Sequence, residues 1–372
     1  MVNSTLRPLT GLFLFLSLVF FLSLGARNPV TDSIPQPRSL SPQWEFSGFV
    51  DAFYAADILT NNKGGNRIQP FLFNHNRHNA FNVNLAMLKV RAESDYYRAV
   101  VHLQTGTYAI ENYATEPALL QGIYEAYAGI ALNVKKTIWL DMGVFESHIG
   151  YESAISIHNE TLTRSMTAEN SPYFVTGARF SYRPKPNLLL RAVLTNGWQR
   201  IQRSPAQSWP SFGTQIQYTS DNGITLNWST YFTAVYPGNT ERKKRFYNNI
   251  FLRQDLPGGL SYIIGVDIGR QEDRQLGQNK DTYTWVTPSA LIAFPIASKW
   301  RMAARIEGFR DANNSIIAQD FSAWATSINF DYQPTTEVAW RFELKHLRSS
   351  DAFIEAESNL IFTTSIAVLI GE

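Results

Sequence analysis

Charged side chains recur at every second position in several segments whose other positions are apolar. Arg301 and Arg305 alternate with apolar residues in 300–310, and Arg341 and Lys345 do so nearer the C-terminus. In a closed protein core each such charge would cost several kcal/mol unless it were paired. So many charges on one face predict water beside that face, where they could recognise ions and polar solutes electrostatically. The predicted set is Arg179, Arg191, Arg253, Arg301, Arg305, Arg341, Lys345, Asp51, Glu125, Asp141, Asp267, Glu307 and Glu343.

Charges of opposite sign fall on different parts of the chain. Basic members of this set concentrate near the C-terminus, whereas Glu125 and Asp141 lie in the first half of the sequence. Opposed walls of charge would produce a transverse field with a mild preference for anions. The alternative is a ladder of salt bridges in which Glu307 and Glu343 neutralise the basic residues beside them.

A second group of candidate residues lies in the longest stretch without strand character, 147–173. Connections of this length are unusual unless they are functional or disordered. We expect this loop to fold into the interior of the molecule and to form a constriction; an external flap is the alternative. Its candidate residues are His148, Glu152, His158, Glu160, Arg164 and Glu169.

The same residue types give little support for catalysis or metal binding. His148 and Glu152 are four residues apart, but Gly150 lies between them and no helical pattern surrounds them. The chain has no cysteine, and its glycines form neither a phosphate-binding loop nor a nucleophile elbow. Ser147 precedes His148 directly, so in a strand the two side chains would point to opposite faces. We therefore predict no catalytic residue, no metal and no cofactor.

The segments that must position these residues follow a period of two, which is typical of strands with one apolar and one polar face. Many are long enough to cross a membrane at a tilt, and eight long connections alternate with seven short ones. This pattern predicts an all-β fold, a transmembrane antiparallel up-and-down β-barrel of about 16 strands. The predicted strands are 44–58, 81–93, 96–108, 122–132, 137–146, 174–183, 188–198, 211–220, 224–236, 245–255, 260–271, 283–295, 300–310, 321–333, 337–348 and 360–370.

Composition agrees with a barrel. Of the 372 residues, 44% are hydrophobic, 13% aromatic and only 17% charged, below the roughly 25% charge of soluble domains. After residue 26 no apolar run of about 18 residues could span a bilayer as a helix. An ordinary soluble enzyme, a helical membrane protein and a disordered chain are all disfavoured. The net charge of +2 creates no strong field for nucleic acid.

The N-terminus resembles a secretory leader. Arg7 precedes an apolar core at 11–24, and the small residues Gly25 and Ala26 follow. We predict a signal peptide at 1–26, an extended periplasmic lead-in at 27–43 and the barrel at 44–372. An N-terminal anchor helix is the alternative to a cleaved leader. The alternation of connections places both termini in the periplasm.

The region from Gly143 to Gln199 resembles the OmpL-like putative beta-barrel porins of Bacteroidetes. It contains Gly143-Val144-Phe145, Ile149-Gly150-Tyr151-Glu152, Asn159 with Arg164-Ser165, Ser171-Pro172-Tyr173-Phe174-Val175-Thr176-Gly177-Ala178-Arg179 and Thr195-Asn196-Gly197-Trp198-Gln199. These pieces are similar to a family pattern of a strand, a polar loop holding Gly-Tyr-Glu, and a strand pair ending in Asn-Gly-Trp. Val144 departs from it, because a basic residue is expected after the glycine.

The resemblance implies a porin in the outer membrane of a Gram-negative bacterium. With the polar interior, it predicts a water-filled channel through which small hydrophilic solutes diffuse passively. Expected partners are outer-membrane lipid, lipopolysaccharide near the basic first loop, and the barrel-assembly machinery, although the chain ends on Glu372 and not on an aromatic residue. A homotrimer is the assembly to consider because trimers are common among porins, although the sequence shows no distinct interface stripe. A receptor or adhesin acting through the loops, or less readily a barrel hydrolase, is the alternative function.

Overall fold

The structure is a computed structural model. It describes residues 41–59, 67–205, 207, 209–235, 243–273, 281–311, 313, 315–317, 321–349 and 358–371. The expected leader and most of the expected lead-in lie outside the described residues.

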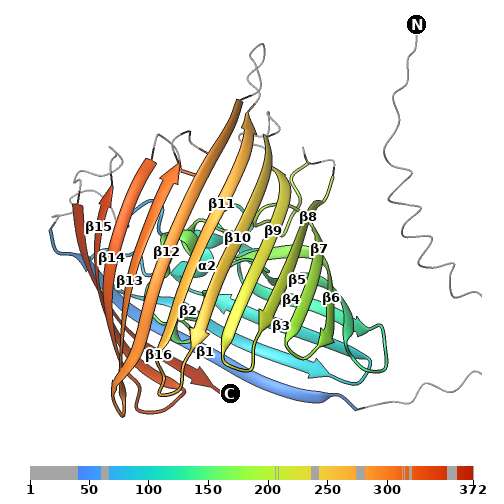
Figure 1. Ribbon diagram of the computed structural model, residues 1–372. Coiled ribbons are helices and arrows are strands. Elements are labelled where there is room, and N and C mark those ends of the chain that lie inside the picture. The colour runs from blue at the N-terminus through green and yellow to red at the C-terminus, as the bar shows by residue number, and fades with distance from the viewer. Residues whose placement is uncertain are drawn as a thin grey trace, which may run out of the picture. The chain divides into compact units, whose positions relative to one another are not determined.

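Within the described residues, sixteen antiparallel strands close into one barrel (Figure 1). Each strand pairs with its neighbours in the chain, and β1 pairs with β16, so the sheet has no free edge. The predicted fold class is confirmed, and every predicted strand is present with ends within three residues of those predicted. The strands are β1 (Gln43–Asp57), β2 (Ala80–Glu93), β3 (Tyr97–Thr105), β4 (Ile123–Ala131), β5 (Ile138–Glu146), β6 (Phe174–Lys185), β7 (Leu188–Thr195), β8 (Ser211–Thr219), β9 (Ile224–Val235), β10 (Lys243–Asp255), β11 (Ser261–Asp273), β12 (Asp281–Ala297), β13 (Trp300–Asp311), β14 (Phe321–Tyr332), β15 (Val338–Ser349) and β16 (Ser358–Ile370).

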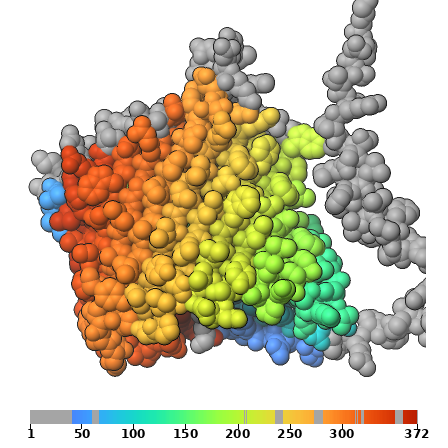
Figure 2. Space-filling model, in the orientation of Figure 1, coloured from blue at the N-terminus to red at the C-terminus, as the bar shows by residue number. Residues whose placement is uncertain are grey.

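The two faces of the barrel wall have opposite character. Along β14, Asn329 and Asp331 are buried inside the barrel, whereas Trp324 and Ile328 are 44% and 46% exposed on the outside. The other strands repeat this arrangement, so large apolar side chains cover the outer surface that Figure 2 shows. An apolar exterior around a charged interior is the reverse of a soluble protein. It suits a wall that faces lipid outside and water or polar loops inside.

The short helices lie in the long connections. They are α2 (Thr107–Asn112), α3 (Ala118–Gln121), the 3-10 turn η1 (Ser156–His158) and α4 (Met166–Glu169). The predicted strand 96–108 is too long because Gly106, at φ 119°, turns the chain out of the sheet and into α2. A Cβ at Gly106 would lie 2.5 Å from the Asn84 carbonyl oxygen, so the turn requires glycine. None of the helices among the described residues is long and apolar enough to cross a bilayer.

Candidate functional site

All thirteen side chains predicted for the polar face lie at the inward-facing positions of their strands. Arg191, Arg253 and Arg301 remain partly exposed inside the barrel. The other ten are buried: Asp51, Glu125, Asp141, Arg179, Asp267, Arg305, Glu307, Arg341, Glu343 and Lys345. Most are buried because loops that enter the barrel cover them. The interior therefore divides into charges that bind these loops and charges that still face open space.

The loop 147–173 lies inside the barrel and contacts strands from β9 to β15. The His148 ring bonds to the Thr230 carbonyl oxygen on β9 at 2.9 Å. The Tyr151 hydroxyl is 2.8 Å from Ser289 Oγ on β12, and the Thr163 amide donates to Glu343 on β15 at 2.6 Å. An external flap would make no contact with these inward-facing groups.

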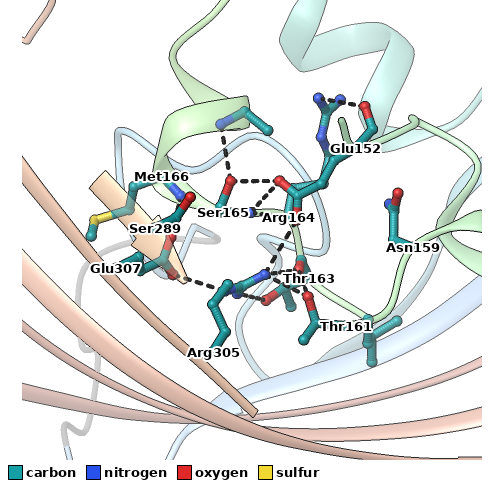
Figure 3. A network of polar contacts seen from close by, with 12 residues as sticks. Glu152, Asn159, Thr161, Thr163, Arg164, Ser165, Met166, Ser289, Arg305 and Glu307 are labelled. Atoms are coloured by element: carbon teal, nitrogen blue, oxygen red, sulfur yellow. Dashed lines mark hydrogen bonds and ion pairs between the residues drawn. The ribbon is translucent and has the colours of Figure 1, made fainter. Parts of the chain in front are cut away.

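Arg305 on β13 is the centre of the network that holds the loop (Figure 3). Its side chain is fully buried, and Nη1 donates to Thr161 Oγ1 and to the Thr163 carbonyl oxygen, both at 2.6 Å. Its guanidinium also lies 3.2 Å from Glu343 and 3.3 Å from Glu307. The two carboxylates therefore compensate the buried charge of Arg305. This pairing agrees with the salt-bridge ladder that was the alternative to a transverse field.

Glu307 connects this network to the start of α4. Its Oε2 accepts from the Met166 amide at 2.5 Å, and its Oε1 lies 3.0 Å from Lys345 Nζ. The Ser165 hydroxyl caps α4 by accepting from the Ala168 amide at 3.1 Å. The wall thus fixes the loop by charge-assisted hydrogen bonds to its backbone, which are stronger than neutral ones.

Glu160 anchors the loop at the far end of the barrel. Its carboxylate lies 2.8 Å from Arg253 Nη2 and 2.7 Å from Arg301 Nη2, and it accepts from Ser261 Oγ at 3.1 Å. These three partners are close to the short connections 256–260 and 298–299. The loop leaves β5 at the opposite end, so it crosses the whole length of the interior.

Two glycines on the wall make room for rings of the loop. A Cβ at Gly213 would lie 2.6 Å from His148 Nε2, and one at Gly265 would lie 3.1 Å from Tyr151 Cε1. Loop and wall therefore fit together only because these inward positions lack side chains.

Gly213→Ala is expected to lower the free energy of unfolding by about 1–3 kcal/mol, because the added methyl group displaces the His148 ring from its niche. Urea unfolding in detergent micelles measures the effect. Gly308→Ala is the matched control, since a Cβ there meets its nearest neighbour, Pro288, at an ordinary 3.5 Å. Equal stability of the two variants would show that the ring does not occupy the niche.

The docked His148 ring is neutral. Burial, with a smaller contribution from Arg191 and Arg179, lowers its pKa from 6.5 to about 4, although the hydrogen bond to Thr230 favours the charged form. Released from the wall, the ring would take up a proton as the pH falls below 6.5, whereas the docked ring stays neutral down to about 4. Docking is therefore strongest above pH 6.5 and loses about 3 kcal/mol by pH 4.

This linkage predicts that current through the open barrel becomes noisier between pH 6.5 and 4, as the loop begins to detach. Recordings at stepped pH measure the noise, and the His148→Asn variant should lose the dependence. A dependence that persists in the variant would assign it to another group.

Two further loops enter the interior, and the first of them contacts two of the predicted residues, Asp51 and Glu169. His75 lies 2.8 Å from Asp51, and the Phe73 amide donates to Glu169 at 2.8 Å. In the next long connection, Glu116 accepts from the Ile201 amide at 2.9 Å.

On β14, Asp331 accepts from Arg341 at 2.8 Å. The period of two could have identified Asp331, but no sequence signal identifies the loop residues.

The predicted acidic wall on β4 and β5 is wrong. Asp141 accepts from Arg98 Nε and Nη2, both at 2.7 Å, and from Arg179 Nε at 3.0 Å. Glu125 lies 3.6 Å from His102. Two guanidinium groups flank the one aspartate, so this part of the wall is not acidic. The predicted transverse field required an acidic wall on β4 and β5, and the structure does not provide one.

Open space remains beside the inserted loop. One cavity of about 410 Å³ extends from Tyr124 on β4 and Gln217 on β8 to Arg253 and Asp255 on β10. A second, of about 350 Å³, also contacts Arg253 and Asp255 and is lined by His158 of the loop.

Among the described residues, no group of histidines and acids could hold a metal ion. Ser147 Oγ accepts from the Ile149 amide, whereas the His148 ring bonds to β9, so the two side chains have separate partners.

A closed barrel of this size, apolar outside and charged inside, with a long loop inserted into it, defines the porin class of outer-membrane proteins. The chain belongs to the family of the OmpL-like putative beta-barrel porin-2, whose family model matches residues 43–370. The predicted family and porin class are thereby confirmed, and the chain is located in the outer membrane. Membership in a porin family also points away from an enzyme.

Solved porins share the fold at low sequence identity. The outer membrane channel DcaP of Acinetobacter baumannii is 12% identical with a TM-score of 0.60, over 89% of this chain and 98% of that one. The anion-selective porin from Comamonas acidovorans is 9% identical with a TM-score of 0.58, over 88% and 100%. OmpT of Vibrio cholerae, in a trimer form, is 9% identical with a TM-score of 0.58, over 88% and 99%. No curated protein matches the sequence significantly.

Proposed function

We propose that this porin lets small hydrophilic solutes and ions diffuse passively across the outer membrane, and that loop 147–173 forms the constriction. One observation carries the proposal: the loop is bound to the wall along the length of the barrel, from His148 to Glu160. Solutes would pass through the space beside it, along Arg253 and Asp255, which border both cavities.

The inward charges then have two roles. Arg191, Arg253 and Arg301 are partly exposed and would contact passing solutes. Buried groups such as Arg305 and Glu343 would instead keep the loop in place. Among the loop residues, Glu152 and Glu160 would act as anchors, whereas His158 borders open space.

The setting of the channel follows from the topology. The even number of strands brings both termini to the same end of the barrel, which is also the end of the short connections. We assign this end to the periplasm because outer-membrane barrels have their short turns on that side. Residues 1–26 would be the leader. Outer-membrane lipid, lipopolysaccharide and the barrel-assembly machinery are the proposed partners, and a homotrimer is the proposed assembly. In the basic first loop, Arg67 and Arg77 already pair with Glu111, which leaves less positive charge for lipopolysaccharide than the sequence indicates.

Single-channel recording of the refolded protein in planar bilayers tests the function. Discrete steps of conductance, with uncharged polymers excluded above a sharp size limit, support a diffusion channel. Binding of a ligand to the loops without conductance would instead identify a receptor or adhesin.

A further inference from the structure

Strands β3 to β6 carry a row of directly opposed residues with an excess of positive charge. Arg98 is opposite Gly129, Gly129 is opposite Asp141, and Asp141 is opposite Arg179. Arg98 reaches across β4 because Gly129 has no side chain; a Cβ there would lie 2.1 Å from Asp141 Oδ1. Two arginines therefore share one aspartate, so these four opposed residues carry a charge of about +1; Glu125 on β4 lies 3.6 Å from His102.

Arg191 on β7 adds to this excess. It is opposite Ser181 and Gln215, and its Nη1 donates to Gln215 Oε1 at 3.1 Å. Its Nε has no hydrogen-bond partner, and within the described part of the chain no carboxylate lies at ion-pair distance. Arg191 is thus a partly exposed cation without an acidic partner.

The opposite wall has no such excess. On β13 and β15, Arg305 and Lys345 are compensated by Glu307 and Glu343, and the whole group is buried under the loop. Ions that pass beside the loop would meet little net charge on that wall. The charges on β3 to β7 therefore add to the field of the open path, beside Arg253 and Asp255, which border both cavities.

The larger cavity opens on that side. It is bordered by Tyr124 on β4 and by Gln217 on β8, and in the closed barrel β5, β6 and β7 lie between these two strands. Gln217 and Gln215 share the inward face of β8, and Gln215 binds Arg191. Arg191 therefore binds the inward neighbour of Gln217, and Gln217 borders the cavity.

We propose that Arg98, Arg179 and Arg191, the arginine wall, make this channel select small oxyanions such as carboxylates and phosphate, and that Arg191 binds them in passage. Guanidinium groups donate charge-assisted hydrogen bonds to such anions. A lumen potential of about one kT raises the anion concentration and lowers that of cations, which changes their ratio about sevenfold. This inference depends on the proposed channel function and adds the class of solute to it.

Reversal potentials across planar bilayers in a KCl gradient test the selectivity. The wild-type channel is expected to favour chloride over potassium severalfold; Arg191→Gln should reduce the ratio at least twofold, and Arg191→Lys should restore it. Arg348→Gln is the matched control, because Arg348 is exposed on the outside of β15 and should leave the ratio unchanged. Heat-modifiable migration on gels confirms that each variant has folded.

Competition tests the binding of oxyanions. Phosphate or acetate added to chloride should reduce the wild-type current, and Arg191→Gln should need a severalfold higher concentration for the same reduction. Conductance without anion preference, a ratio that Arg191→Gln does not change, or currents insensitive to both oxyanions would overturn the inference and leave the channel intact. Absence of any conductance would overturn the proposed function itself.

Discussion

Replacing residues 153–168 with a short Gly-Ser linker is expected to raise single-channel conductance by a factor of about 3, because a barrel of about 16 strands encloses a wide aqueous lumen when nothing fills it. The deleted residues include Glu160 and Thr163, which bind the wall at Arg301 and Glu343. Planar-bilayer recording measures the change, and the size limit for polymers should rise in parallel.

A replacement of equal length distinguishes the effect of the loop's volume on conductance from the effect of its attachment to the wall. If residues 153–168 become a sixteen-residue Gly-Ser sequence, the anchoring groups are lost but the chain remains. The current should then be raised but noisy, because an unattached segment moves in and out of the path. An unchanged conductance in the short-linker variant would mean that the loop does not set the constriction.

The second large effect is expected from Arg305→Met, which should lower the free energy of unfolding by about 3 kcal/mol. The methionine fills most of the volume, but Glu343 and Glu307 lose the cation they share inside the barrel. This loss in the free energy of unfolding lies near the lower end of the range for breaking a buried ion pair, because the loop can detach and admit water to the carboxylates. Urea unfolding followed by tryptophan fluorescence measures it, and the detached loop should also increase channel noise.

The double variant Arg305→Met/Glu343→Gln tests whether the pairing causes this loss. Removing one uncompensated carboxylate should recover part of the stability, so the double variant should be more stable than the sum of the single effects predicts. Arg348→Met, on the outside of β15, is the control and should change stability by less than about 0.5 kcal/mol. Strict additivity would show that Arg305 contributes only through packing.

The strands and the inward side of each strand could be predicted because both depend on local alternation. In 300–310, Arg301 and Arg305 are four positions apart, so in a β-strand their side chains point to the same face of the sheet. Turn residues and the alternation of connection lengths then indicated antiparallel neighbours. The exception, 96–108, shows the limit: Gly106 ends β3 early, and the close approach of Asn84 that makes this glycine necessary comes from β2.

The partners of the inward charges could not be predicted, because they depend on register and on where the loops lie. Asp141 was expected to make its wall acidic, but Gly129 lets Arg98 reach it from two strands away. Likewise, nothing local to Glu160 indicates that Arg253 and Arg301 bind it.

By itself, the sequence determined a barrel with an apolar exterior and a charged interior, since side-chain alternation is a property of each strand taken alone. The tertiary structure decided which charges remain available to solutes. Burial of Arg305 beneath the loop is a result of long-range contacts, and so is the position of Arg191, beside which no acid lies among the described residues. Electrostatic selectivity depends on the charges left uncompensated after pairing, and pairing depends on distances that exist only in the closed barrel.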